Sequence, residues 1–363
     1  MKSFDEIFVD KTKYGVKIQT REYDEVGEHI IIDQGQSRIA GYTDREEGLF
    51  EEVPVIIFGD HTRVIKYVDE PFFLGADGVK VLRSKDDNAN YKYLYYALKN
   101  ARIPDTGYNR HFKWLKEVQI NYPVSDKQAE IVEILDKVSS VIKKREDELY
   151  VLDDLIKARF VEMFGDENNS KKWDVVNIEE VADIQVGVVI KPSQYYTEEG
   201  NGVRAFRSLN VGAGFIKDTD WVYFTQEGHH KNTKSILREN DLLIVRSGAP
   251  GTACVVTEQY AGYNAIDIII AHPDCERVNP YYLCTFTNMP HGKKQIDEGT
   301  SGAAQQHFNI GKYSKLKLML PPKELQDDFA DFINQVDKSK VAVQKALEET
   351  QLLFDSLMQQ YFG

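Results

Sequence analysis

The chain carries two copies of one long segment, separated by a constant offset of 198 residues. Residues 123–165 align without a gap onto residues 321–363, and both copies end on the same Phe-Gly pair. Other identical positions are Pro123/Pro321, Gln128/Gln326, Val138/Val336, Leu149/Leu347 and Leu155/Leu353. An internal repeat of this kind predicts that the two halves of the chain fold alike.

Each copy has the pattern of a long helix that packs along one seam. Apolar residues recur at the a and d positions of a heptad. These seam residues are Leu135, Val138, Ile142, Leu149 and Leu152 in the first copy, and Ile333, Val336, Leu347 and Phe354 in the second. About 40 residues at 1.5 Å per residue predict a helix roughly 60 Å long. Ser125 and Gln128 predict a capping box at the start of the first helix only.

The seams also contain polar residues, namely Arg145, Arg159, Lys340 and Thr350. Such interruptions favour two helices of one chain packing together over a free-standing homodimeric zipper. An ordinary coiled coil without a specific role is the simpler alternative. The repeat argues against it, because both helices follow similar domains.

The segments that precede the helices correspond more weakly. Residues 71–82 resemble residues 259–270, and "TGYNRHF" at 106–112 resembles "TSGAAQQHF" at 300–308. Short β-branched and aromatic runs such as "VPVIIF" and "DLLIV" alternate with glycine-rich turns, which is typical of irregular α/β domains. The sequence therefore predicts a mixed α/β fold in the order domain 1–122, helix 123–165, domain 166–320 and helix 321–363.

Composition limits the kind of partner that this chain binds alone. The net charge is −13, and each of the four predicted segments has more acidic than basic residues. Binding to nucleic acid by the chain alone would require clustered Lys and Arg, because phosphates must be neutralised. No stretch approaches 18 apolar residues, the N-terminus lacks the apolar run of a signal peptide, and there are three scattered cysteines. We therefore expect a cytoplasmic protein without a membrane partner.

The order and spacing of these features resemble the specificity subunit of a type I restriction–modification system. The resemblance covers nearly the whole chain and depends on the duplicated helices, which open with "PVSDKQAEIVEIL" and "PPKELQDDFADFI", and on the domain before each. Two departures are Lys323 where the first helix has Ser125, and a short lead-in, from which we expect a trimmed or divergent start of the first domain.

The resemblance implies a fold, partners and a cofactor. It implies two target-recognition domains, held apart by the two helices as an antiparallel coiled coil, each reading one half of a split double-stranded DNA target. It further implies a pair of methyltransferase (modification) subunits docked on the helices, and a restriction subunit that supplies motor and nuclease. The S-adenosylmethionine cofactor would belong to the methyltransferase partner, with no cofactor, metal or catalytic residue in this chain.

Polar side chains on loops are the candidates for reading base edges, because Arg, Lys, Asn, Gln and Ser match the hydrogen-bonding groups of the grooves. The candidates are Arg63, Asn109 and Arg110 in the first domain, and Lys191, Arg204, Arg207, Arg246, Ser247, Gln305 and Gln306 in the second. Lys293 and Lys294 are candidate phosphate contacts. For any single residue the alternative is a solvated side chain or a local ion pair. His111 and His307, each followed by Phe, are predicted to brace the junction of domain and helix.

Signals for catalysis within the chain are weak. "NPYY" at 279–282 lacks the second proline of the amino-methyltransferase motif and is better explained as a turn that starts a short helix. There is no GxxxxGK[ST] phosphate loop, and the histidines lack metal-ligand spacing. Two other interpretations remain: a scaffold whose domains bind proteins, which the even acidity favours, and a self-contained methyltransferase.

Overall fold

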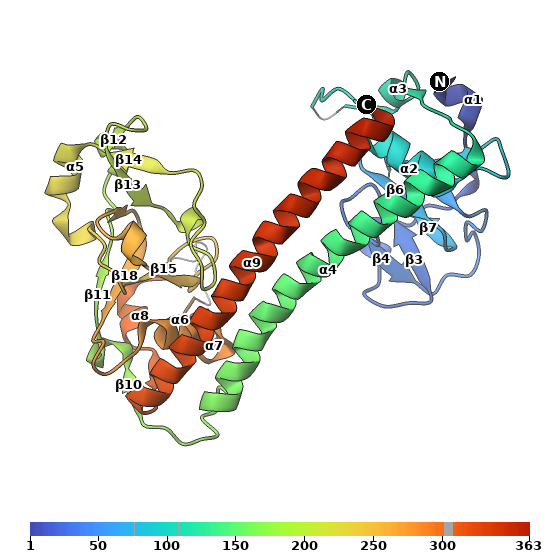
Figure 1. Ribbon diagram of the computed structural model, residues 1–363. Coiled ribbons are helices and arrows are strands. Elements are labelled where there is room, and N and C mark those ends of the chain that lie inside the picture. Colours follow the sequence, from blue (N-terminus) through green and yellow to red (C-terminus); the bar gives the residue numbers. More distant parts are fainter. Residues whose placement is uncertain (76, 108, 301–307) are drawn as a thin grey trace. The chain divides into compact units, whose positions relative to one another are not determined.

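The computed structural model describes residues 1–75, 77–107, 109–300 and 308–363. It divides into two compact units (Figure 1). The first contains Met1–Glu146 and Lys345–Gly363, and the second contains Asp147–Gln344. Each unit therefore combines one globular domain with part of both long helices. Within the described residues, no helix is long and apolar enough to cross a membrane.

The first unit is built around short strands and few helices. Its strands are β1 (Lys2–Ser3), β2 (Phe8–Asp10), β3 (His29–Ile32), β4 (Gly41–Thr43), β5 (Val55–Gly59), β6 (Ile65–Val68), β7 (Phe72–Leu74), β8 (Val79–Ser84) and β9 (Gln119–Ile120). Its helices are α1 (Phe4–Ile7), α2 (Tyr91–Lys99), α3 (Phe112–Leu115) and the first half of α4 (Ser125–Phe164). The end of α9 (Lys323–Phe362) completes it.

The second unit repeats this plan with additions. Its strands are β10 (Val175–Asn177), β11 (Ala182–Val186), β12 (Tyr196–Thr197), β13 (Val203–Phe206), β14 (Val222–Phe224), β15 (Leu242–Val245), β16 (Ala253–Val255), β17 (Asn264–Ala265), β18 (Ile268–Pro273) and β19 (Lys317–Met319). Its further helices are α5 (Gln226–Lys231), α6 (Pro280–Asn288), α7 (Pro290–Thr300) and α8 (Ile310–Ser314).

The sheets of the two units have the same topology. The sheet β2-β8-β5-β6 corresponds to β11-β18-β15-β16, and in both sheets every neighbouring pair is antiparallel. A second sheet pairs β3 antiparallel with β4 and parallel with β7, as β13 pairs with β14 and β17. The pairing of β1 with β9 matches that of β10 with β19. The two domains therefore begin and end with the same strand pairing, and a trimmed or divergent start of the first domain stays a prediction.

The central strand of each large sheet is buried on both faces, which explains its continuous apolar sequence. In β5, Ile56 and Phe58 pack with α2 and the long helices, whereas Val55 and Ile57 pack against β3 and β7. The strand β15 divides its side chains in the same way: one alternate set faces the helices and the other faces the smaller sheet. Since successive side chains of a strand point to opposite faces, one apolar strand serves two cores.

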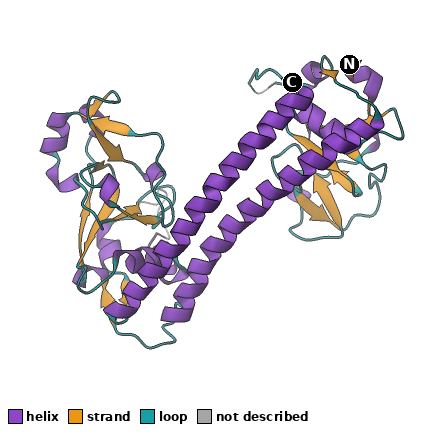
Figure 2. Cartoon of the chain, in the orientation of Figure 1, coloured by secondary structure: helices purple, strands orange, loops and turns teal. Residues whose placement is uncertain are grey.

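The two long helices pack antiparallel, as predicted. In each unit α4 and α9 run side by side in opposite directions (Figures 1 and 2). In the second unit, Phe329 of α9 lies 5.4 Å from both Phe160 and Phe164 of α4, measured between ring centroids. In the first unit, Phe354 and Met358 of α9 share a core with Leu135.

None of the predicted heptad positions is exposed. The buried seam side chains are Leu135, Ile333, Val336 and Phe354, and the half-buried ones are Val138, Ile142, Leu149, Leu152 and Leu347. Their part in binding another protein stays a prediction.

The predicted capping box is not formed, because Ser125 is the first helical residue rather than the cap. The Gln128 side chain instead donates to the Pro123 carbonyl at 2.8 Å, and Gln326 donates to Pro321 at the same distance. Both helices therefore begin in the same way.

Candidate nucleic-acid interface

Three loops of the first unit meet beside the ends of β3 and β5. We call residues 33–36, 60–63 and 105–111 the first loop cluster, with residue 108 outside the described part. The Gln34 side chain connects the loops: its Oε1 accepts from the His61 backbone at 3.1 Å, and its Nε2 donates to the Asp77 carbonyl at 2.9 Å. The Thr62 hydroxyl donates to the Gln34 carbonyl at 2.6 Å. Hydrogen bonds of polar side chains therefore join the loops of this cluster to one another.

The cluster contains all three reader candidates of the first domain. The Arg63 guanidinium pairs with Asp105 at 2.7 Å, and its backbone adopts the left-handed conformation, with φ of 61°. The Asn109 carbonyl accepts from the His61 ring at 3.2 Å. Arg110 is exposed. The pKa of Asp77 is lowered mainly by its hydrogen bond from Lys17 and more weakly by the positive charge of Arg110.

His111 is a structural residue. Its side chain is buried, and both its ring Nδ1 and its backbone N–H donate to the Asp60 carbonyl, at 3.0 and 2.8 Å. The Asp60 carboxylate in turn accepts from the backbone N–H of Phe112, the first residue of α3, at 2.7 Å. These bonds attach the turn after β5 to α3. His307 lies outside the described residues.

The sequence analysis did not identify Lys66, whose side chain bonds the loop that follows β3. Its ammonium group is buried and donates to the Ser37 and Asp33 carbonyls at 2.6 and 2.8 Å. Burial lowers the pKa of Lys66, and the Asp33 carboxylate at 3.5 Å opposes that shift. A lysine facing inward from an otherwise apolar strand is a signal that sequence reading could have used.

The second unit places its loops at the equivalent edge. We call residues 207–217 and 246–252, with Asp267, the second loop cluster. The Arg246 guanidinium pairs with Asp267 and donates to the Phe308 carbonyl at 3.3 Å. Arg207 donates to the Asp220 carbonyl, and its buried Nε has no acceptor within the part of the chain that the structure describes. The loops that carry Arg207, Arg246 and Ser247 lie side by side, and their role as DNA contacts stays a prediction.

The remaining candidates lie elsewhere or outside the described residues. Arg204, on β13, lies 5.5 Å over the Trp221 ring and 3.6 Å from Asp218. Lys191 is exposed and left-handed, with φ of 43°, directly before a 3-10 turn at Pro192–Tyr195. Lys293 donates to the Pro250 carbonyl, and Lys294 is exposed. Gln305 and Gln306 lie in the segment that is not described. All of these residues stay predictions as DNA contacts.

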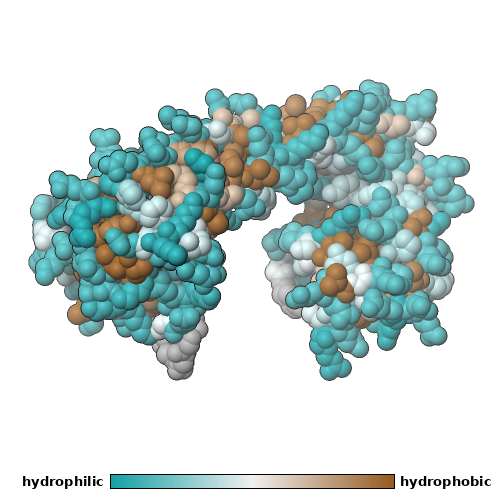
Figure 3. Space-filling model, turned by 90° about the horizontal axis from the view of Figure 1, so that it is seen from below, coloured by the Kyte–Doolittle hydropathy of each residue, from teal (hydrophilic) through white to brown (hydrophobic). Residues whose placement is uncertain are grey.

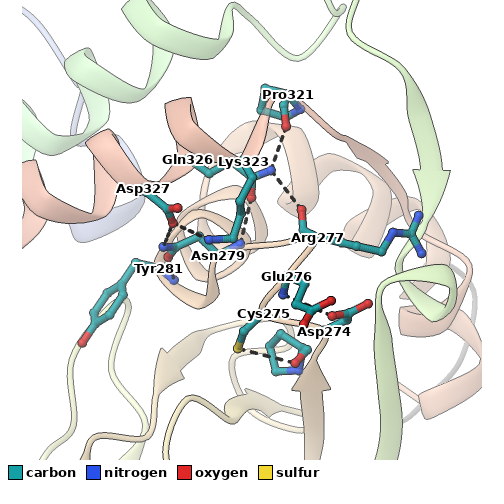
Figure 4. A network of polar contacts seen from close by, with 11 residues as sticks. Asp274, Cys275, Glu276, Arg277, Asn279, Tyr281, Pro321, Lys323, Gln326 and Asp327 are labelled. Atoms are coloured by element: carbon teal, nitrogen blue, oxygen red, sulfur yellow. Dashed lines mark hydrogen bonds and ion pairs between the residues drawn. The ribbon is translucent and has the colours of Figure 1, made fainter.

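A polar network attaches the N-terminal end of α9 to the globular domain of the second unit (Figure 4). The buried Gln326 side chain donates to the carbonyls of Pro321 and Arg277 at 2.8 and 3.3 Å, and accepts from the Asn279 backbone at 2.8 Å. Asn279 caps α6 by accepting from Tyr281 at 2.9 Å, and its amide donates to Asp327 at 2.7 Å. The "NPYY" segment therefore starts a short helix, as expected.

In both units the reader candidates that the structure describes lie mainly on hydrogen-bonded loops. Among the described residues, no group of three or more His, Cys, Asp and Glu side chains is placed to hold a metal ion. Arg63, Arg204, Arg207 and Arg246 each contact a neighbouring side chain or carbonyl, so their donor groups are pre-positioned. A binding site needs functional groups that neighbouring residues hold in place.

Comparison with known proteins identifies relatives of one kind. The chain is 25% identical over 250 residues to the specificity subunit of the type I restriction enzyme EcoR124I/EcoR124II of Escherichia coli, a match of 65% of this chain and 61% of the relative. It is 23% identical over 313 residues to the MjaVIII specificity subunit of Methanocaldococcus jannaschii, covering 76% of this chain and 72% of the relative.

The fold is also that of a solved specificity subunit. The crystal structure of the type I restriction–modification S subunit from M. genitalium matches with a TM-score of 0.57 at 17% identity, over 100% of this chain and 95% of the other. The family model of the type I restriction modification DNA specificity domain matches residues 11–150 and 170–351, one span in each half of the repeat. The chain therefore belongs to the type I restriction–modification DNA specificity family.

Proposed function

We propose that this chain is the DNA-recognition subunit of a type I restriction–modification complex, and that each unit reads one half of a split target. The observation that carries the proposal is the repeated sheet topology. Each unit has a corresponding pair of sheets, and each presents a loop cluster at the equivalent edge. A duplicated frame with different loops suits two half-sites of different sequence. The relatives named as specificity subunits support it, although the match spans only 61% of the first relative.

In the proposed complex, other subunits perform the chemistry. This chain would be non-catalytic, and a methyltransferase subunit would supply S-adenosylmethionine and the pocket for an extruded base. A restriction subunit would complete the assembly, in the cytoplasm. Much of the phosphate contact would then come from partners, which reconciles recognition of DNA with a net charge of −13.

The long helices are the proposed docking surface for a pair of methyltransferase subunits. Apart from the seam, they carry exposed apolar side chains: Val141, Tyr150, Val151, Leu155 and Val161 on α4, and Val341, Leu352 and Leu353 on α9. In the space-filling view, apolar patches interrupt an otherwise hydrophilic surface (Figure 3). Exposed apolar groups of this kind are typical of surfaces that another protein covers. That the helices also set the spacing between half-sites stays a prediction.

The proposal is tested by selection from a random duplex pool, with the chain assembled with its methyltransferase subunit. We expect two short motifs separated by a fixed number of unspecified base pairs. The assembled complex with Arg63→Ala should lose selectivity in one motif, and Arg246→Ala in the other, each by about 1–3 kcal/mol per lost base contact.

Lys171→Ala, which changes an exposed lysine in the turn after α4, is the matched charge control. It should leave both motifs unchanged. Enrichment of a single contiguous motif, or of none, would contradict the proposal.

A further inference from the structure

A small apolar pocket opens within the second loop cluster. Its volume is about 330 Å³, and it lies between the turn that joins Val211 to Ile216 and the turn that joins β15 to β16. Most lining residues are apolar or glycine, and they include Leu209, Val211, Phe215, Val245, Gly248 and Ala249.

The pocket is constructed by specific backbone contacts. The Gly212 N–H donates to the Phe215 carbonyl at 2.8 Å, and the Gly214 N–H donates to the Ala253 carbonyl at 2.8 Å, so the first turn is fixed to the second. A Cβ at position 212 would lie 2.7 Å from the Phe215 ring. Glycine at this position therefore allows the ring to form the pocket wall.

Two apolar side chains at the pocket remain exposed to water. Phe215 is 57% exposed and Leu209 is 40% exposed. The lining residues include no carboxylate, and their one cation, Lys217, has no ion-pair partner among the described residues. Arg207 of the same cluster donates to a carbonyl and adds positive charge nearby, whereas the charge of Arg246 is paired with Asp267. An apolar pocket with cationic side chains near it is complementary to a ligand that has both an apolar group and phosphates.

We propose that this pocket receives the C5 methyl group of a thymine in the half-site read by the second unit, and that Phe215 is a specificity-determining residue. The inference rests on the proposed function. The thymine methyl is the apolar group that the major groove presents, and contact with it distinguishes thymine from the other bases. Lys217, the cation that lines the pocket, would contact a flanking phosphate.

Comparison with the first unit explains why the apolar pocket occurs in the second unit. Strand pairing places Lys66 opposite Ile57 in β6 and Cys254 opposite Leu243 in the corresponding strand β16. Beneath the first loop cluster there is therefore a buried ammonium group bonded to loop carbonyls, and beneath the second there is an apolar thiol side chain. The equivalent strand position therefore carries Lys66 beneath the polar first loop cluster and Cys254 beneath the apolar pocket of the second.

The test uses the assembled complex and the motif selected from random duplexes. Each thymine of the motif is replaced, one at a time, by deoxyuridine, which lacks only the C5 methyl group. Because one buried methyl contributes about 0.8 kcal/mol, we expect one replacement in the second half-site to weaken binding about fourfold. Replacements in the first half-site should change binding less than twofold. Phe215→Ala should remove the difference between thymine and deoxyuridine at the sensitive position.

Val175→Ala, which shortens an exposed apolar side chain of the same unit outside the pocket, is the control and should retain the difference. A second half-site without thymine, or deoxyuridine without effect at every position, would overturn the inference while leaving the bipartite motif intact. If no bipartite motif is selected at all, the proposed function itself fails. Loss of methyltransferase binding by Phe215→Ala in the absence of DNA would instead assign the pocket to a protein side chain and overturn the thymine assignment.

Discussion

The two loop clusters occupy the same place in the same frame and differ in chemistry. In the first, Gln34, His61 and Thr62 bond the loops to one another above the buried Lys66 ammonium group. In the second, Arg246 is held by Asp267 at the edge of an apolar pocket that leaves Phe215 exposed. The comparison teaches that sheet topology and helix packing are the constant part of this chain, and that the loops are the variable part.

The largest effect should come from the core that joins helix and domain, where matched positions differ in size. Phe329 is fully buried against Phe160 and Phe164, whereas its counterpart in the repeat is Ile131. Phe329→Ala should lower the free energy of unfolding of the second unit by about 3–5 kcal/mol, and Ile131→Ala that of the first unit by about 2–4 kcal/mol. Urea unfolding followed by hydrogen exchange in each unit measures both. A larger loss at Ile131 would break the expected order.

Mutations at the N-terminal ends of the two long helices should also differ in how much they destabilise their units. Gln326 bonds two carbonyls and one backbone N–H, whereas Gln128 bonds the Pro123 carbonyl. Because a buried group that loses its partner is costly, Gln326→Ala should destabilise its unit by about 2–4 kcal/mol and Gln128→Ala by about 1–2 kcal/mol. Thermal unfolding of the two variants compares them directly, and equal losses would argue that the extra bonds of Gln326 contribute little.

Acid sensitivity should be a property of the second unit. His291 is buried in α7, and its Nε2 donates to the Gly165 carbonyl at 3.0 Å. Burial lowers its pKa from 6.5, so the unfolded chain takes up this proton at a higher pH than the folded chain does. Stability is therefore full above about pH 6.5 and falls below it, by at most about 1.4 kcal/mol per pH unit.

His291→Gln should flatten this dependence when unfolding of the second unit is measured between pH 7 and pH 5. If the variant and the unchanged protein show the same slope over that range, the histidine is not the group responsible.

The smallest effect on stability should come from Lys66, although it should affect recognition. Methionine removes the desolvation cost of a buried ammonium group, and this gain offsets part of the cost of leaving the Asp33 and Ser37 carbonyls without their donor. We therefore expect Lys66→Met to change the unfolding free energy by less than about 1.5 kcal/mol, yet to release the loop at 33–37 and weaken selectivity in the first half-site about tenfold. Cys254→Ala, at the equivalent position, is the control and should leave the first motif intact. Unchanged selectivity in Lys66→Met would contradict the role assigned to this residue.

The repeat and the helices could be predicted from the sequence because their signals are local. The constant offset and the heptad period identified both helices, and the seam residues from Leu135 to Phe354 are buried or half-buried. The capping box was wrong because Gln128 bonds the Pro123 carbonyl instead, a choice that depends on where the chain enters the helix.

The site was less predictable because its contacts join distant segments. The parallel pairing of β3 with β7 connects residues about 40 apart, and it sets which loops meet. Arg246 could be named from its loop, but its partner Asp267 is fixed only by the pairing of β15 with β18. The pocket wall at Phe215 had no signal in the sequence beyond the glycines around it.

The central claim is that each unit reads its own half of the target. It is tested most directly by exchanging residues 166–320 for the equivalent segment of a relative with a different target, and then mapping the methylated sequences of cells that carry the exchanged chain. The account predicts that one half of the motif is replaced by the corresponding half of the relative's motif, while the other half stays as it was. Replacement of both halves, or no change in either, would contradict it.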